Sequence, residues 1–186
     1  WDHTADKLLQ LFKKKLARTR DVASPENFRP LLGAHYYPWY GAGEQSRHWN
    51  ENTEYATIED SPSSGIYSSD DRATISRHLA LAEEAGLDYL VVNLQISGSG
   101  FDPHELRAAD RLFETAHETF PDLSLCFMLT FDQADSATIE SSLDWLEQKC
   151  RQYPNYLRLR SKPVVWFFIT EGFIGHFFFR FSSFLE

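Results

Sequence analysis

The 186-residue chain contains little cysteine, a single methionine and no surplus of positive charge. Its two cysteines, Cys126 and Cys150, cannot form a disulfide framework, and no CxxC motif or His/Cys spacing indicates zinc. Eighteen basic residues against 27 acidic ones give a formal net charge of −9, which argues against a nucleic-acid-binding surface. Because Met128 is the only methionine, we expect that Trp1 is not a translation start and that the chain belongs to a longer protein.

Phosphate-binding and membrane-spanning motifs are also missing. No GxGxxG or Walker A pattern follows an expected strand, which disfavours a nucleotide-binding doubly wound sheet. The apolar stretch 163–179 contains Glu171 and His176 and falls short of the roughly 20 apolar residues that a transmembrane helix needs. We therefore expect no cofactor, no metal and no evident membrane association. Neither a signal peptide nor an Asn-x-Ser/Thr sequon indicates the compartment.

Hydrophobic periodicity predicts helices that alternate with strands. Apolar residues at helical spacing predict helices over 71–85, 103–120 and 138–153, with Leu81 among the inward-facing residues of the first. Nearly continuous apolar runs predict strands over 31–36, 89–94, 123–131 and 163–169. Strands that are apolar on both faces and separated by helices indicate a parallel sheet covered by helices. We predict an α/β fold of the (β/α)8 TIM-barrel type, of which this chain holds about the first four units.

Three parts are expected along the chain. Residues 1–30 are predicted to form an N-terminal amphipathic helix and a linker, residues 31–169 the partial barrel, and residues 170–186 an atypical tail rich in phenylalanine. The tail has no clear hydrophobic period. A frameshift or a retained intron would explain this change in composition, so a truncated product without function remains an alternative.

The segment from residue 37 to about residue 70 follows the first expected strand and has no helical or strand period. Five aromatic side chains lie between Tyr36 and Trp49, interleaved with histidines and an arginine. Long loops are usually functional, and the loops after the strands build the active site of a β/α barrel. Aromatic faces stack on sugar rings while polar tips bind hydroxyl groups, so the loop predicts a carbohydrate site. Nucleobase stacking is disfavoured by the acidic charge, and packing of some rings at the barrel end remains open, above all for Tyr36.

Several motifs in a fixed order resemble glycoside hydrolase family 99, which contains endo-α-mannosidases. These are HYYPWYG (35–41), RHW (47–49), GIYSSDD (65–71), AGLDYLVV (85–92) and KPVVWFF (162–168). The resemblance covers roughly residues 32–168 and implies retaining hydrolysis of glycosidic bonds in mannose-containing glycans such as mannan, without a metal. The substrate would be an oligosaccharide or polysaccharide. The candidate substrate-binding residues on these motifs are Tyr37, Trp39, Tyr40, His48, Trp49, Tyr67 and Asp70.

The resemblance assigns no catalytic residue to this chain. Family members use two glutamates on a later strand, which the resemblance places after residue 186, so we expect the fragment alone to be inactive. Asp132 and Glu171, after the third and fourth strands, remain as candidate carboxylates. The segments 93–95 and 128–131 depart from the family pattern and lack expected sugar contacts. A non-catalytic glycan-binding module is the alternative, and a secretory or extracytoplasmic location follows by analogy alone.

Overall fold

A computed structural model describes residues 30–42, 48–49, 62–63, 65–98, 100–132, 134–159 and 161–169. The chain divides into two units, Trp1–Leu31 and Leu32–Glu186, and every element described below belongs to the second. The amphipathic helix expected near the N-terminus and the tail 170–186 lie outside the described residues. The three-part division of the chain therefore stays a prediction.

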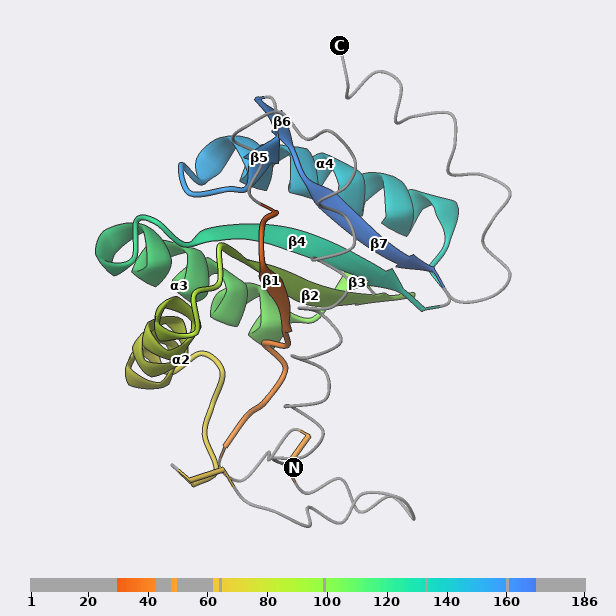
Figure 1. Cartoon of the computed structure of the whole chain (residues 1–186). Helices are drawn as coiled ribbons and strands as arrows, with labels where there is room; N and C mark the ends of the chain where they lie inside the picture. Colours follow the sequence, from red (N-terminus) through yellow and green to blue (C-terminus); the bar gives the residue numbers. More distant parts are fainter. Residues whose placement is uncertain are drawn as a thin grey trace, which may run out of the picture. The chain divides into compact units, whose positions relative to one another are not determined.

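Four parallel strands form the central sheet, in the order β1 (Gly33–Tyr36), β2 (Tyr89–Ser97), β4 (Ser124–Phe131) and β7 (Val165–Ile169) (Figure 1). The helices α2 (Arg72–Glu84), α3 (Pro103–Thr119) and α4 (Ser136–Gln152) connect them in turn. Sheet order follows chain order, so these strands contain no topological switch point of the kind that doubly wound sheets have. This sequential winding is that of a β/α barrel, and it confirms the predicted fold class.

Short strands complete the described part and correct two predicted boundaries. β3 (Gly100–Phe101) folds back antiparallel onto the end of β2, which continues to Ser97 rather than ending at Leu94. β5 (Arg158–Leu159) and β6 (Lys162–Pro163) form a hairpin before β7. The predicted strand over 163–169 therefore begins too early. Pro163 has no backbone N–H for a central ladder, and the parallel pairing starts at Val165.

An aspartate caps the N-terminus of each of the helices α2, α3 and α4. Asp71 accepts the backbone N–H of Thr74 at 2.8 Å, and Asp135 accepts that of Thr138 at 2.8 Å. Asp102 accepts the N–H of His104 at 2.8 Å at the start of α3. These caps satisfy backbone donors that have no partner inside the helix. They fix where the three helices start.

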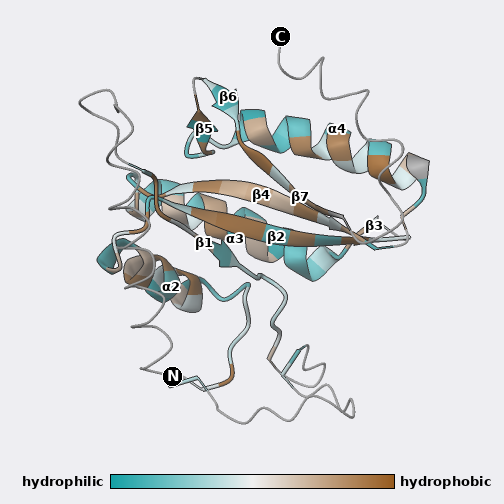
Figure 2. Ribbon diagram, turned by 45° about the vertical axis from the view of Figure 1, so that its right-hand side comes forward, coloured by the Kyte–Doolittle hydropathy of each residue, from teal (hydrophilic) through white to brown (hydrophobic). Residues whose placement is uncertain are grey.

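Helices α2, α3 and α4 pack on one face of the sheet. The ring of Tyr36 in β1 meets His78 of α2, and Phe127 in β4 meets Phe113 of α3 at 4.8 Å and Trp145 of α4 at 5.2 Å between ring centroids. Figure 2 shows the apolar strands against the apolar sides of these helices. The predicted inward position of Leu81 is wrong, because its side chain is 55% exposed. It lies two residues beyond the buried Leu79, about 200° around the helix.

The opposite face of the sheet, here called the open face, carries polar and aromatic side chains. Strand register aligns Asn93 with Met128 and Trp166, and Gln95 with Thr130 and Phe168. The Thr130 hydroxyl donates to the side-chain oxygen of Asn93 at 2.6 Å, although Asn93 is only 3% exposed. Trp166 and Phe168 remain 43% and 55% exposed. In a closed barrel this face lines the interior.

Cys126 lies on the open face, beneath these larger side chains. Its thiol is fully buried, and burial raises its pKa to about 12. Cys150, on α4, is also buried, and burial raises its pKa as well. Both cysteines are free. They therefore act as small apolar core residues.

Candidate aromatic binding site

Three of the predicted binding residues form a packed unit, here called the aromatic cluster: Tyr40, Trp49 and Tyr67. The ring centroid of Trp49 lies 4.4 Å from that of Tyr40 and 4.9 Å from that of Tyr67. The Trp49 indole N–H donates to the backbone carbonyl of Tyr67 at 2.7 Å, and the side chain is 7% exposed. Tyr67 in turn packs edge-on against His78 of α2, at 5.0 Å. Trp49 therefore forms the centre of the cluster and Tyr40 and Tyr67 flank it.

Three other predicted residues, Tyr37, Trp39 and His48, form a stack. Tyr37 lies 4.5 Å from Trp39, and Trp39 lies 4.9 Å from His48, with 26° between the ring planes in both pairs. Tyr37 is 40% exposed. His48 has a backbone φ of 57°, in the left-handed region that few non-glycine residues adopt. The buried indole nitrogen of Trp39 has no hydrogen-bond acceptor among the described residues.

His35 links this stack to the open face of the sheet. Its ring lies 6.4 Å from that of Tyr37 and 6.5 Å from that of Trp166 in β7. The second contact spans the two intervening strands, as expected for a sheet that curls toward this face. The result is a continuous row of rings, here called the ring row: Trp166, His35, Tyr37, Trp39 and His48. Sequence reasoning missed Trp166, which alternation along its strand could have placed on the open face.

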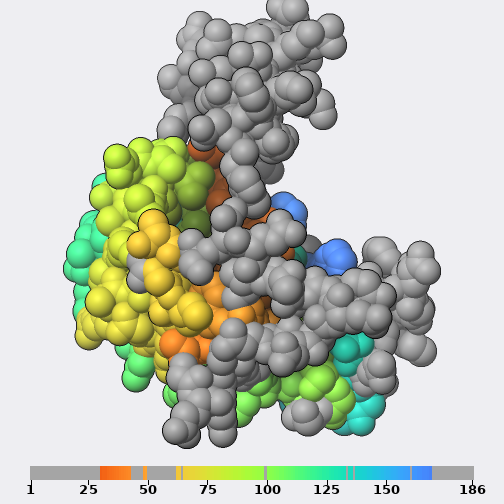
Figure 3. All heavy atoms as spheres, turned by 90° about the horizontal axis from the view of Figure 1, so that it is seen from below, coloured from red at the N-terminus to blue at the C-terminus, as the bar shows by residue number. Residues whose placement is uncertain are grey.

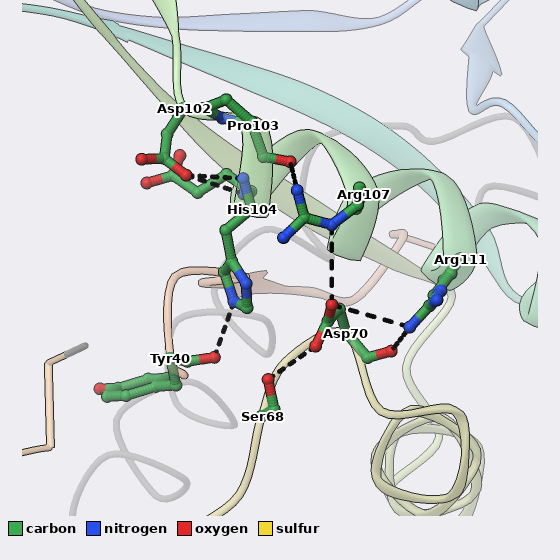
Figure 4. A network of polar contacts seen from close by, with 9 residues as sticks. Tyr40, Ser68, Asp70, Asp102, Pro103, His104, Arg107 and Arg111 are labelled. Carbon is green, nitrogen blue, oxygen red and sulfur yellow. Dashed lines mark hydrogen bonds and ion pairs between the residues drawn. The ribbon is translucent and has the colours of Figure 1, made fainter. Parts of the chain in front are cut away.

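Asp70 is held by polar contacts rather than by rings (Figure 4). The Ser68 hydroxyl donates to one carboxylate oxygen of Asp70 at 2.6 Å, while Arg107 and Arg111 of α3 lie 3.8 and 3.7 Å from the other. Partial burial tends to raise the pKa of Asp70. The Ser68 hydrogen bond and the charges of His104, Arg111 and Arg107 outweigh it and hold the pKa below its ordinary value. The carboxylate is therefore ionised at neutral pH.

Hydrogen bonds between Tyr40 and Ser69 join the loop after β1 to the turn before α2. The Ser69 N–H donates to the Tyr40 carbonyl at 2.7 Å, and the Tyr40 N–H donates to the Ser69 hydroxyl at 3.2 Å. Ser69 is 1% exposed. His104 Nε2 lies 2.9 Å from the same Tyr40 carbonyl. Figure 3 shows the two segments side by side on the surface, in orange and yellow.

A buried carboxylate that sequence reasoning missed lies at the end of β2. Glu105 is 2% exposed, and its Oε2 accepts the backbone N–H of Gln95 at 2.8 Å. β1 pairs with β2 only as far as Val92, so Glu105 supplies an acceptor where that strand pairing has stopped. The sequence indicates this burial by the position of Glu105, which shares one face of α3 with the buried residues Ala108, Ala109 and Leu112.

The candidate catalytic carboxylates are only partly described. Asp132 is exposed after the end of β4, and its backbone N–H donates to the Ile96 carbonyl at 2.8 Å. Glu171 lies outside the described residues. Within the described ranges, no three histidine, cysteine, aspartate or glutamate side chains gather as metal ligands would. None of the helices in that part of the chain has the length and hydropathy needed to cross a membrane.

A cavity of about 420 Å³ lies beside β1 and α2. Its walls include Tyr37, Tyr40 and Tyr67 of the predicted set, together with the paired side chains of Tyr36 and His78, whose Oη and Nδ1 atoms are 3.2 Å apart. Burial, together with the charge of Arg77, lowers the pKa of His78. Burial raises the pKa of Tyr36 and of Tyr67. These groups are therefore neutral at pH 7 and offer hydrogen bonds rather than charge.

Comparison with solved structures identifies the architecture. Two structures of the GH99 endo-alpha-mannosidase from Bacteroides thetaiotaomicron, one in complex with Bis-Tris propane, match with TM-scores of 0.61 and 0.58 at 20% identity. The chain has part of a GH99-type fold. These matches cover 76% and 77% of this chain but only 42% and 45% of the matched chains. A glycoside hydrolase-like protein matches with a TM-score of 0.51 at 15% identity, over 79% of this chain and 45% of that one.

The GH99 likeness establishes the fold and leaves activity open, because its sequence identity is low. The chain spans less than half the length of the solved structures that it matches. No family model matches the chain, and no curated protein matches it. The resemblance of the sequence motifs to family 99 is thus supported at the level of structure, for four strands and three helices of the barrel among the described residues.

Proposed function

We propose that this chain supplies part of the substrate cleft of a glycoside hydrolase that acts on mannose-containing glycans. The observation that carries the proposal is the ring row, which extends from the open face of the sheet to the loop after β1. Tyr37 and Trp166 expose 40% and 43% of their surfaces along it. Aromatic faces of this kind stack on the apolar faces of sugars, and the neighbouring imidazole and phenol groups bind hydroxyls.

The position of the rings supports the same function. Substrates of β/α barrels bind at the carboxyl ends of the strands, and the loop after β1 begins at that edge. The similar solved structures include a GH99 endo-alpha-mannosidase. The motifs that resemble family 99 include both Tyr37 in the ring row and Tyr67 in the aromatic cluster. Substrate class and retention of configuration are carried over from that resemblance as part of the proposal.

Hydrolysis requires an acid that protonates the leaving oxygen and a second group that assists at the anomeric carbon. The candidate carboxylates on this chain are Asp132, which follows β4, and Glu171, which lies outside the described residues. The proposal assigns the main catalytic pair to the remainder of a longer protein. This chain's residues would then bind and orient the glycan.

Direct binding tests the proposal. The purified chain is titrated with a linear manno-oligosaccharide by calorimetry, with single-stranded oligonucleotide as a competing ligand class. We expect saturable binding of the glycan, weakened at least fivefold by Tyr37→Ala and by Trp39→Ala. Trp39→Phe separates stacking from hydrogen bonding, because it keeps a ring and removes the indole N–H. Tyr89→Ala, at the amino end of β2, is the matched control and should bind as the wild type does.

Circular dichroism confirms that each variant is folded. A folded wild-type chain that binds no glycan at millimolar concentration would contradict the proposal, and preferential oligonucleotide binding would replace it with the nucleobase alternative. A non-catalytic glycan-binding module predicts the same titration. A hydrolysis assay on the longer protein distinguishes the two.

A further inference from the structure

The first half of α3 contacts both segments that build the aromatic site (Figure 4). His104 Nε2 lies 2.9 Å from the Tyr40 carbonyl oxygen, in the loop after β1. A carbonyl oxygen only accepts hydrogen bonds, so the Nε2 atom carries the proton. Two turns along the helix, Arg111 reaches Asp70 in the turn before α2, through the carboxylate and through the backbone carbonyl. One helix therefore ties two separate segments together.

The helix itself is firmly placed. Asp102 caps its N-terminus by accepting the N–H groups of His104 at 2.8 Å and Glu105 at 3.2 Å. Leu112 and Phe113 on its inner side are fully buried in the core. Glu105 fixes the first turn to the end of β2 through the backbone of Gln95. The residues that reach the aromatic loop thus project from a rigid support.

The contacts to Asp70 contribute little to global stability. The side chains of Arg107 and Arg111 are 56% and 52% exposed, and ion pairs between exposed groups are weak because water and salt screen them. What they do restrict is geometry. Two arginines one turn apart on α3 both face one carboxylate oxygen of Asp70, and Ser68 holds the other oxygen. This arrangement fixes the turn that carries Ser69, whose N–H bonds to Tyr40.

We infer that His104, Arg107 and Arg111 are positioning residues, which hold the aromatic cluster and the ring row in the arrangement that binds a glycan. Asp70 is the residue that the two arginines hold. The inference rests on the proposed function. Rings held in place before binding lose less conformational freedom when a sugar stacks on them, so the contacts raise affinity without touching the ligand.

Two measurements on four variants test the inference. The variants are His104→Ala, His104→Gln, Asp70→Asn and, as the matched control, His117→Ala, an exposed histidine in the last turn of the same helix. Hydrogen exchange of the Ser69 amide reports the loop without any ligand, and calorimetry with a manno-oligosaccharide reports binding. We expect His104→Ala to speed Ser69 exchange at least tenfold and to weaken glycan binding at least fivefold. His104→Gln restores an N–H donor and should lie within twofold of the wild type in both.

The outcomes separate the inference from the proposed function. If the wild type binds no glycan, the proposed function fails, while faster Ser69 exchange in His104→Ala still supports the positioning role. If His104→Ala matches His117→Ala in both measurements, the positioning role is overturned. If His104→Ala does not fold, Asp70→Asn decides by Ser69 exchange without ligand, because it keeps the side-chain size and removes the charge that the arginines face. If His104→Gln and His104→Ala lost equal amounts of glycan affinity and Ser69 protection, the inference would also be contradicted, because the hydrogen bond to the Tyr40 carbonyl would not be what holds the loop.

Discussion

Replacing Trp49 with alanine tests whether the aromatic cluster is a packed unit. The side chain is 7% exposed, so folding removes nearly all of its surface from water. About 200 Å² of buried aromatic surface at about 25 cal/mol/Å² corresponds to about 5 kcal/mol. Substitutions of buried aromatic residues by alanine cost about 3–5 kcal/mol in measured cases. We therefore expect Trp49→Ala to lower the free energy of unfolding by about 3–5 kcal/mol.

Two further variants resolve the components of that loss. Trp49→Phe keeps an aromatic ring but leaves the Tyr67 carbonyl without the indole donor that lies at 2.7 Å, which should cost about 1–2 kcal/mol. Trp166→Ala is the matched control for the same residue type. Because Trp166 is 43% exposed, the area calculation gives it about 3 kcal/mol as an upper value, and no enclosed cavity is left behind.

Urea unfolding followed by circular dichroism gives the three free energies, with the m-value checking that the folded and unfolded states stay comparable. The expected order of loss is Trp49→Ala, then Trp166→Ala, with Trp49→Phe clearly milder than Trp49→Ala. A Trp49→Ala variant within about 0.5 kcal/mol of the wild type would refute the packing argument. If such a stable variant also lost glycan binding, Trp49 would act by contacting the sugar directly and not by packing the aromatic cluster.

Two other predictions concern groups with shifted pKa values. Cys126 and Cys150 are buried with raised pKa values, so a thiol reagent at pH 8 should leave both unmodified in the native chain and modify both after denaturation; rapid native labelling would contradict their burial. The pKa of Asp70 is lowered in the fold, so its contribution is complete above the unfolded pKa of about 3.9 and is lost as the pH falls through the folded value. Asp70→Asn should therefore cost at most about 1 kcal/mol at pH 7, as measured by urea unfolding, and less below a pH of about 3.9. A constant difference across that range would exclude the charge as its source.

The sheet could be predicted from the sequence because its central strands are buried on both faces. In β2 and β4 most residues are apolar and buried, so periodicity and length suffice to recognise them. β3, β5 and β6 have two residues each, too few for any hydrophobic pattern. Leu81 was predicted to face inward because leucine is usually buried. Its angular position around α2, however, turns its side chain away from the sheet.

The aromatic site could be located from the sequence but not resolved. Tyr37 and Trp49 come from one loop of similar composition, yet one is 40% exposed and the other 7%. The difference depends on partners elsewhere in the chain, since Trp49 bonds to Tyr67 and Tyr67 packs on His78. Contacts between residues so far apart in the chain cannot be predicted from the local sequence. The arginines that face Asp70 left a fainter signal, four residues apart on one side of a predicted helix.

The unequal lengths of the first two strands explain why α3 meets the aromatic loop. β1 ends at Tyr36, opposite Val92, while β2 continues to Ser97. The backbone of β2 beyond that point needs partners other than β1, because buried N–H and C=O groups are costly when left unpaired. Glu105 and the short strand β3 supply them, and Glu105 lies in the first turn of α3. This hydrogen bonding places the start of α3 at the edge of the sheet where the loop after β1 begins. His104, in the first turn of α3, therefore lies against the Tyr40 carbonyl.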